Sequence, residues 1–321
     1  MRILVTGGAG FIGSHLCERL ISDDHLVTAL DNFSTGRASN LASLADSDNF
    51  ALVEGSILDP ITLNPLIHGV DYIFHLAAAV GVFNIVKNPL DSLLTNIRGT
   101  ENVLEAAHET KTPVFLTSSS EVYGKNISNS LKESDDRILG SPVTLRWSYS
   151  EAKAIDESLA YAYFIEKQLE TRIVRFFNTV GPRQLGAYGM VVPRFVKAAL
   201  SNEPITIYGD GNQTRCFAHV YDVVDAVLAI AFAENTIGKV INIGNNFEIS
   251  INSLAKKIIE ETSSKSEIIY VPYEEAYGDG FEDMERRVPN IDLINQLVSW
   301  KPKRDLSTMI ADISSEMQKG S

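Results

Sequence analysis

The chain has 321 residues, of which 45% are hydrophobic and 21% charged, ordinary values for a folded globular protein that argue against global disorder. Its formal net charge of -13 argues against general nucleic-acid binding, because neutralising phosphates requires clustered lysines and arginines. No apolar run approaches the roughly 20 residues of a membrane span, and the opening MRILVTGG is too glycine-rich for a signal peptide. We therefore expect a cytoplasmic protein that binds neither nucleic acid nor membrane.

Cysteines and histidines give no sign of a metal centre. The only two cysteines, Cys17 and Cys216, are far apart in the chain, and the six histidines show no metal-ligand spacing. We expect two buried thiols, no disulfide and no bound metal.

The first half of the chain alternates short β-rich apolar runs with longer helical patterns. Strands are expected at 2–6, 26–31, 50–55, 71–77, 114–118 and 172–177, and helices at 11–22, 90–109 and about 150–168. Continuous apolar strands separated by helices predict a parallel sheet that is covered on both faces. The expected fold class is therefore α/β, with a doubly wound parallel sheet.

The rhythm changes after the strand at 172–177, where glycine and proline become more frequent. Short strands are expected near 205–208 and 239–243, and helices near 192–201, 220–233, 250–263 and 305–318. We expect a first domain at 1–177, to which 220–243 returns, and a smaller C-terminal α/β domain made mainly from 178–321. A cleft between two such domains is the expected ligand site.

A glycine-rich turn, VTGGAGFIGSH, follows the first expected strand and opens the first expected helix. Gly7, Gly10 and Gly13 allow a tight turn and close approach to a pyrophosphate, and the helix N-terminus favours its negative charge. Asp31 ends the second strand about 20 residues later, where a carboxylate accepts hydrogen bonds from an adenosine ribose and repels a 2'-phosphate. These features predict NAD rather than NADP, although the nearby Arg37 is compatible with NADP.

The segment SYSEAK places Tyr149 and Lys153 four residues apart, on one face of a helix. A phenol with a pKa of about 10 is a poor base at neutral pH, but an adjacent ammonium and a positive nicotinamide ring would stabilise the phenolate. Tyr149 would then take a proton from a sugar hydroxyl while hydride leaves for NAD. Because Tyr-x-x-x-Lys alone is common, a solvated helix face is the alternative interpretation.

With these motifs at these spacings, essentially the whole chain resembles the extended short-chain dehydrogenase/reductase family, in particular its nucleotide-sugar epimerases, dehydratases and decarboxylases. The resemblance implies a Rossmann domain and a tightly held NAD that is first oxidant and then reductant within one turnover. It also implies that the smaller C-terminal domain grips a nucleotide-diphosphate sugar, expected to be UDP-linked. Relatives commonly dimerise through the helix near 90–109 and the helix that bears Tyr149, so we expect a homodimer.

The resemblance also assigns roles to individual residues. In the reaction, Ser119 would hydrogen-bond the reacting hydroxyl, with Ser120 beside it, and Lys153 would also touch the nicotinamide ribose. The expected cofactor contacts are Gly7, Gly10, Phe11, Ile12, Gly13, Asp31, Asn32, Ser56, Ile57, Leu76, Ala77, Ala78, Asn96, Thr117, Ser118, Tyr149 and Lys153. The expected nucleotide-sugar contacts are Asn178, Arg183, Val192, Arg194, Tyr208 and Arg215. Of these, Asn178 and Arg215 would meet the diphosphate, which arginines bind through charge-assisted hydrogen bonds.

The segment LTSSSEVYG places Glu121 behind a run of hydroxyls. The family's 4-epimerases usually have a small residue there, whereas Ser-Glu is closest to the UDP-glucuronate decarboxylases. A second acid/base helps in those enzymes, because the 4-keto intermediate is a β-keto acid that loses carbon dioxide and leaves an enolate needing a proton at C5. Arg287 matches the arginine suggested there as proton donor or enolate stabiliser. Its alternative is an exposed member of the Arg286–Arg287 pair.

Two residues depart from the decarboxylase pattern. Ile85 stands where these enzymes usually have a tyrosine that helps to hold the sugar carboxylate, and Ser56 stands where many relatives have an acid that touches the adenine. We predict a UDP-glucuronate decarboxylase that forms UDP-xylose or the 4-keto pentose. The alternative, favoured by Ile85, is a 4-epimerase acting on UDP-glucose or UDP-glucuronate. A sugar-nucleotide-binding regulator without turnover is a third possibility, which an intact Tyr149 and Lys153 disfavour.

Overall fold

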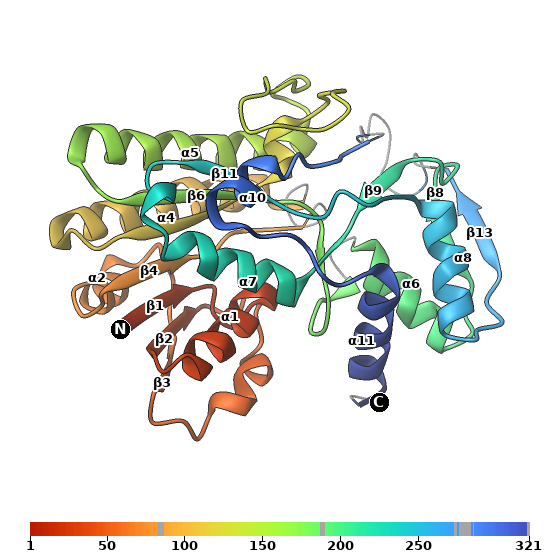
Figure 1. Ribbon diagram of the computed structural model, residues 1–321, viewed down its shortest axis with the longest axis horizontal. Coiled ribbons are helices and arrows are strands. Elements are labelled where there is room, and N and C mark those ends of the chain that lie inside the picture. Colours follow the sequence, from red (N-terminus) through yellow and green to blue (C-terminus); the bar gives the residue numbers. More distant parts are fainter. Residues whose placement is uncertain (82–86, 187–189, 273–274, 276–283, 285, 320–321) are drawn as a thin grey trace.

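The computed structural model describes the chain except residues 82–86, 187–189, 273–274, 276–283, 285 and 320–321 (Figure 1). Its centre is a seven-stranded sheet with the order β11-β6-β5-β4-β1-β2-β3. The strands are β1 (Arg2–Thr6), β2 (Leu26–Asp31), β3 (Phe50–Glu54), β4 (Tyr72–His75), β5 (Val114–Ser119), β6 (Thr171–Phe176) and β11 (Val240–Ile243). Every neighbouring pair is parallel, which confirms the predicted doubly wound sheet.

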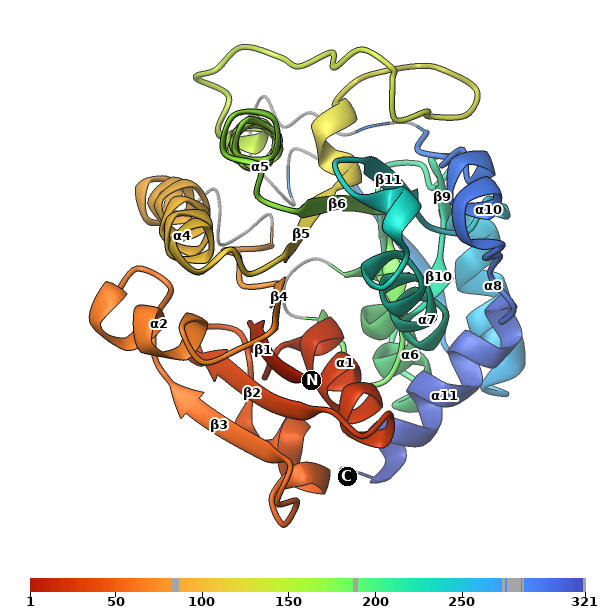
Figure 2. The ribbon, with the colours of Figure 1, turned by 60° about the vertical axis from the view of Figure 1, so that its left-hand side comes forward.

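Helices cover both faces of this sheet (Figure 2). One face carries α2 (Pro60–Ile67), α4 (Pro89–Thr110) and α5 (Ser148–Lys167), and the other carries α1 (Phe11–Ser22), α7 (Val220–Ala231) and α10 (Asp292–Val298). Successive strand residues point to opposite faces. Leu4 therefore belongs to the core under α4, whereas its neighbour Val5 belongs to the core under α1 and α7. This two-sided burial explains why the strands read as continuous apolar runs.

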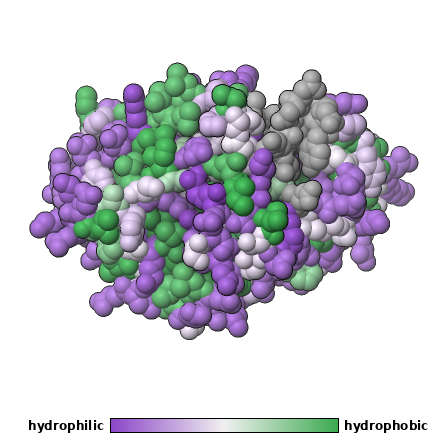
Figure 3. Space-filling view, turned by 90° about the horizontal axis from the view of Figure 1, so that it is seen from above, coloured by the Kyte–Doolittle hydropathy of each residue, from purple (hydrophilic) through white to green (hydrophobic). Residues whose placement is uncertain are grey.

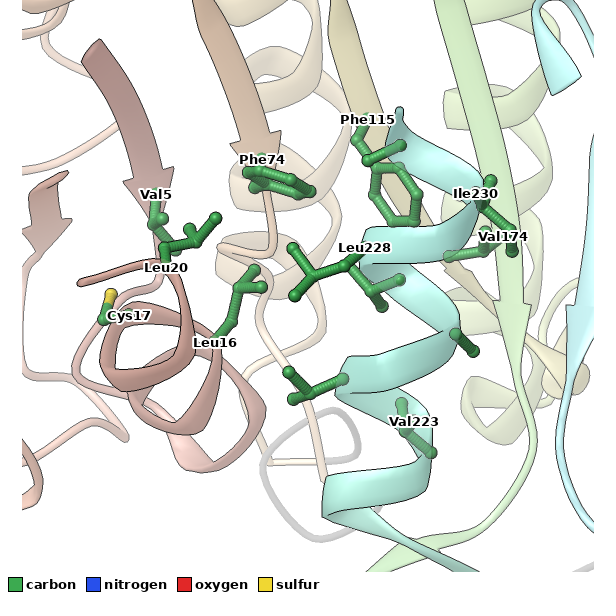
Figure 4. Packing of buried hydrophobic residues seen from close by; sticks show 14 of the residues in the cluster. Val5, Leu16, Cys17, Leu20, Phe74, Phe115, Val174, Val223, Leu228 and Ile230 are labelled. Carbon is green, nitrogen blue, oxygen red and sulfur yellow. The ribbon is translucent and has the colours of Figure 1, made fainter. Parts of the chain in front are cut away.

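The core under α1 and α7 shows how segments distant in sequence share one layer (Figure 4). Leu16 and Leu20 of α1 face the sheet beside Val223 and Leu228 of α7, and all of these side chains are buried. The chain thus returns to the central sheet after residue 220, and β11 completes the sheet edge next to β6. Buried Ile294 of α10 belongs to the same core.

A second, smaller group of elements lies beside the sheet and carries its own apolar cluster (Figure 1). Its helices are α6 (Val191–Leu200), α8 (Ile251–Glu261) and α11 (Leu306–Lys319). Its strands pair as β8 (Ile205–Tyr208) with β13 (Ile268–Val271), β9 (Thr214–Cys216) with β12 (Glu248–Ser250), and β7 (Thr179–Val180) with β10 (Ala218–His219).

Each expected element matches an observed one, with bounds that differ by no more than two residues. Helix α2 is one of the elements that were not predicted. It nevertheless has a local signal, since Pro60 occupies its first turn and the side chain of Asp59 accepts the N–H of Ile61 at its start. None of the helices in the described part of the chain is both long and apolar enough to cross a membrane.

Candidate active site

A cavity of about 520 Å³ runs along the carboxyl ends of β1, β2, β4 and β5 and continues to α6, β8 and β9. Ligands of doubly wound sheets bind at this edge, where the strand order reverses. The predicted cofactor residues that line the cavity are Gly7, Gly10, Phe11, Ile12, Gly13, Asp31, Asn32, Ser56, Ile57, Leu76, Ala77, Ala78, Thr117, Ser118, Tyr149 and Lys153. Except for Asn96, every residue that we expected to contact the cofactor therefore faces one continuous cavity.

The glycine turn after β1 has no room for side chains. Gly7 has a φ of +71°, and a Cβ on it would lie 2.7 Å from the backbone nitrogen of Ala77. A Cβ on Gly13 would lie 2.2 Å from the carbonyl oxygen of Gly7. Glycine is therefore required for the turn itself and for the packing of α1 against it, which leaves backbone N–H groups at the helix start open to an anion.

Asp31 lines the cavity at the end of β2, where the adenosine ribose is expected. Its carboxylate accepts the backbone N–H groups of Ala9 at 3.0 Å and Phe33 at 2.8 Å, which fixes both oxygens at the cavity wall. Burial raises the pKa of Asp31, and these two hydrogen bonds oppose that rise. Arg37 is exposed and does not line the cavity. The residues present therefore fit an adenosine ribose without a 2'-phosphate.

Asn96 does not line the cavity. Its buried side-chain amide instead accepts the N–H of Ala79 at 2.8 Å and donates to the carbonyl of Ala79 at 3.2 Å, which holds the loop after β4. The hydroxyl of Thr117 is likewise committed to the carbonyl of His75, and that of Ser118 to the carboxylate of Glu157. These side chains shape the cavity wall.

Tyr149 and Lys153 both line the cavity, and Lys153 is only 2% exposed, so the pair does not lie on a solvated helix face. Burial, followed by the negative charges of Glu121 and Asp156, raises the pKa of the Tyr149 phenol, and the hydroxyl of Ser119 partly offsets this rise. The protein alone thus keeps Tyr149 protonated. Bound oxidised NAD supplies a hydride acceptor and a positive charge, and such a charge favours the phenolate.

Glu121 lies between two arginines that come from distant parts of the chain. Its Oε2 is 2.6 Å from Nη1 of Arg146, and its Oε1 is 2.8 Å from Nη2 of Arg287. Both arginines are buried. Burial alone would raise the pKa of Glu121, but Arg287 and Arg146 outweigh it and lower that pKa to about 2. In the substrate-free protein Glu121 is therefore a carboxylate and holds no proton to donate at neutral pH.

Local structure fixes this triad of Glu121, Arg146 and Arg287. Glu121 follows β5 in a short 3-10 turn, where its N–H donates to Ser119 and its carbonyl accepts the hydroxyl of Ser150. Arg146 lies three residues before Tyr149 and packs over the ring of Trp147. Sequence reasoning missed Arg146, because nothing in its local context indicates that it meets Glu121.

The consecutive residues Arg286 and Arg287 have different partners. Arg286 is partly exposed and pairs with Glu248, with contacts of 2.8 Å to each carboxylate oxygen. Arg287 is buried, and its Nη1 also donates to Ser120 at 3.2 Å. The exposed-pair alternative for Arg287 is thus wrong, because only Arg286 fits it.

The predicted nucleotide-sugar residues all line the cavity, but they differ in how they are held. Arg194 lies over the ring of Tyr208, 4.3 Å from its centroid, and Val192 is buried beside it on α6. Asn178 donates to the carbonyl of Cys216, and Arg215 donates to that of Thr214.

Arg183 also lines the cavity, but it is held on the cofactor side. Its guanidinium donates to the hydroxyl of Ser14 at 3.2 Å and pairs with Glu18 at 2.6 Å, both on α1. Ile85, on which the epimerase alternative depended, lies outside the described residues.

Comparisons with known proteins agree with this geometry. A model of the NAD-dependent epimerase/dehydratase family matches residues 3–244. UDP-N-acetyl-alpha-D-glucosaminuronate decarboxylase of Bacillus cytotoxicus is 41% identical over 94% of this chain and 92% of that protein. UDP-glucuronic acid decarboxylase 1 of Xenopus tropicalis is 36% identical over 94% of this chain and 68% of that protein.

One solved structure extends the comparison to three dimensions. The UDP-glucuronic acid 4-epimerase from Bacillus cereus, in complex with UDP-glucuronic acid and NAD, superposes over the full length of both chains with a TM-score of 0.90 and 29% identity. With the glycine turn, Asp31 and the Tyr149–Lys153 pair on one cavity, this chain belongs to the NAD-dependent epimerase/dehydratase family, with NAD as its cofactor.

Proposed function

We propose that the protein oxidises C4 of a UDP-linked hexuronate and then releases the sugar carboxyl group as carbon dioxide, forming a UDP-pentose or its 4-keto form. The observation that carries this proposal is the ionised Glu121 held between Arg146 and Arg287 in the cavity that Tyr149 lines. Two relatives similar over most of the chain are named as decarboxylases of UDP-linked uronates.

The charge of the triad suits a carboxylate-bearing sugar. Two guanidinium groups and one carboxylate leave a net charge of about +1 in a largely buried site. A hexuronate carboxylate would neutralise it through charge-assisted hydrogen bonds, which arginine forms well because its donors match a planar carboxylate. A neutral hexose would leave the positive charge unbalanced.

The proton balance of the reaction gives Glu121 a role. Loss of carbon dioxide from a carboxylate consumes one proton, which C5 receives. When the UDP-pentose is formed, Tyr149 is not its source, because the proton taken from the C4 hydroxyl is needed again when hydride returns to C4. An arriving substrate carboxylate would share the arginines with Glu121 and add negative charge beside it, and both effects raise the pKa of Glu121. Glu121 would then take a proton from water and deliver it to C5.

The C-terminal part of the cavity would hold the UDP group. Arg194 and Arg215 are the cations of that end, and the ring of Tyr208 under Arg194 limits the directions in which that guanidinium points. We propose that both arginines bind the diphosphate, and that Asn178 and Val192 complete the wall beside it.

A 4-epimerase is the second candidate. The full-length superposition on a UDP-glucuronic acid 4-epimerase favours it, because that enzyme is named for the same uronate without loss of carbon. Both reactions would begin with oxidation of C4 by NAD, with Tyr149 as the base, so they differ only in the fate of the keto intermediate.

We expect the purified protein to release carbon dioxide from UDP-glucuronate or from UDP-N-acetylglucosaminuronate, and to leave UDP-glucose unreacted. Mass spectrometry of the products measures this directly, and the two uronates show which substituent at C2 is accepted. Tyr149→Phe is the control, expected to bind nucleotide sugar and to form no product. An isobaric product from either uronate would replace the decarboxylase with the epimerase.

Glu121→Gln should lower carbon dioxide release by about two to four orders of magnitude, the range for a positioned acid/base, because an amide cannot deliver the C5 proton. Reduction of NAD by the C4 step should fall much less, and absorbance of the reduced nicotinamide follows that step separately. The matched control is Glu248→Gln, which removes a carboxylate paired with Arg286 outside the cavity. Equal loss of both steps, or none, would remove the role given to Glu121.

We further propose that the protein is a homodimer that buries the outer face of α5 and α4 against a second copy. Ile155, Tyr161 and Ile165 of α5 and Leu90 of α4 are exposed, and the two helices pack side by side. Figure 3, which views the molecule from above, shows hydrophobic surface gathered over the end that holds these helices. A twofold pairing would bury such a patch on both copies at once.

Ile165→Glu should convert the dimer to a monomer, because it places a charge within the proposed contact. Analytical ultracentrifugation measures the change. Phe247→Glu, which also charges an exposed hydrophobic residue but lies outside α4 and α5, should leave the dimer intact. A wild-type protein that sediments as a monomer contradicts the proposal.

A further inference from the structure

A buried carboxylate without a role in the chemistry described so far lies next to the catalytic lysine. Asp156 follows Lys153 by three residues on α5, and its Oδ2 is 3.1 Å from the lysine Nζ. The side chain of Asp156 is 0% exposed and that of Lys153 is 2% exposed. The other oxygen of Asp156 has no hydrogen-bond partner among the residues that the structure describes.

A chain of buried polar side chains leads to Asp156 from the glycine turn. The hydroxyl of Thr6, which directly precedes Gly7, accepts the N–H of Ala77 and lies 2.7 Å from Nδ1 of His75. Nε2 of His75 lies 3.2 Å from the hydroxyl of Thr100. The hydroxyl of Thr100 in turn helps to lower the pKa of Asp156.

Burial, together with the charge of Lys153, lowers the pKa of His75 to about 3, so the imidazole is neutral. A neutral imidazole has one N–H donor and one acceptor nitrogen, so it can bond Thr6 on one side and Thr100 on the other. The hydroxyl of Thr100 favours the charged form of Asp156.

We propose that Asp156 is a positioning residue for the catalytic pair, whose fixed negative charge balances the ammonium of Lys153 and so sets the pH range in which Tyr149 accepts a proton. The inference rests on Tyr149 acting as the base in the proposed function. An ammonium paired with a carboxylate acts on its surroundings as a dipole, with a weaker field than a single charge. Tyr149 therefore keeps its proton until a further positive charge enters the cavity.

Two other carboxylates near this pair also have cationic partners. Glu157, the next residue on α5, is paired with Arg175 of β6 through two contacts of 2.9 and 2.7 Å. Glu121 is paired with its two arginines, yet its negative charge still raises the pKa of Tyr149. From α4, Thr100 faces Asp156, whereas the acidic side chains of Glu101 and Glu105 act on Tyr163 farther along α5.

The energetics of Asp156 also favour a functional role. Burial raises the pKa of Asp156, and neither the charge of Lys153 nor the hydroxyl of Thr100 offsets that rise completely. An ionised carboxylate at this position is therefore held against its desolvation cost. An asparagine would fill the same space and still accept a hydrogen bond from Lys153, so the structure alone does not require the charge.

Asp156→Asn should lower the pKa of Tyr149 by about half a unit to one unit, the effect of removing one charge that lies seven helix residues, or about 10 Å, away. The phenolate absorbance of Asp156→Asn, minus that of Asp156→Asn/Tyr149→Phe, measures this titration without substrate or turnover. It therefore tests the inference separately from the proposed function. With NAD and substrate, the acidic limb of the pH–rate profile for C4 oxidation should shift to lower pH by the same amount.

Two further variants make the test independent of one substitution. Thr100→Val keeps Asp156 but removes the hydroxyl that stabilises its charge, and should shift the profile in the same direction by less. Asp225→Asn removes an aspartate of α7 that pairs with Arg19, away from the catalytic pair, and should shift nothing. A folded Asp156→Asn protein with an unchanged Tyr149 titration, or with lower activity and an unchanged profile, would overturn the inference.

Discussion

The site depends on the need to balance buried charge. The cavity brings together Lys153, Glu121, Arg146 and Arg287, and each of these is held by a fixed partner of opposite sign. Removing one partner of such a buried pair typically costs about 3–5 kcal/mol, because the remaining charge is left without compensation. The pairings therefore constrain how three parts of the chain fit together. These are the end of β5, helix α5, and the segment before α10 that contains Arg287. They also fix which groups carry protons before any ligand arrives.

The same constraint gives the two halves of the site different properties. At the Tyr149–Lys153 pair, burial and the negative charges of Glu121 and Asp156 keep the phenol of Tyr149 protonated. At the triad, two arginines exceed one carboxylate, so the surplus is positive and suits an anionic sugar. A phenol that is deprotonated only after a positive charge enters, beside a positively charged triad, fits the proposed reaction, in which oxidation precedes the loss of a carboxylate.

The sequence predicts those parts of the molecule that have local signals. The parallel sheet follows from apolar runs buried on both faces, and the cofactor end follows from the spacing of Gly7, Gly10, Gly13 and Asp31. Tyr149 and Lys153 are predicted because four residues make about one helical turn. In each case a short stretch of chain determines the geometry.

The remaining features depend on contacts between distant segments, for which the sequence has no local pattern. Arg146 meets Glu121 25 positions earlier in the chain, and Arg183 turns to Glu18 across 165 positions. Asn96 has a polar side chain of a kind that often contacts ligands, yet its amide holds the loop after β4. These assignments require the tertiary structure, because side-chain type alone does not determine which partner is reached.

The most direct measurement of the central claim is a crystal structure of the Tyr149→Phe protein with NAD and a UDP-linked hexuronate. We predict that the sugar carboxylate lies within ion-pair distance, about 4 Å, of Arg146 or Arg287. The C4 oxygen of the sugar should lie at the ring of residue 149. A carboxylate that points to solvent while Glu121 keeps both arginines would contradict it.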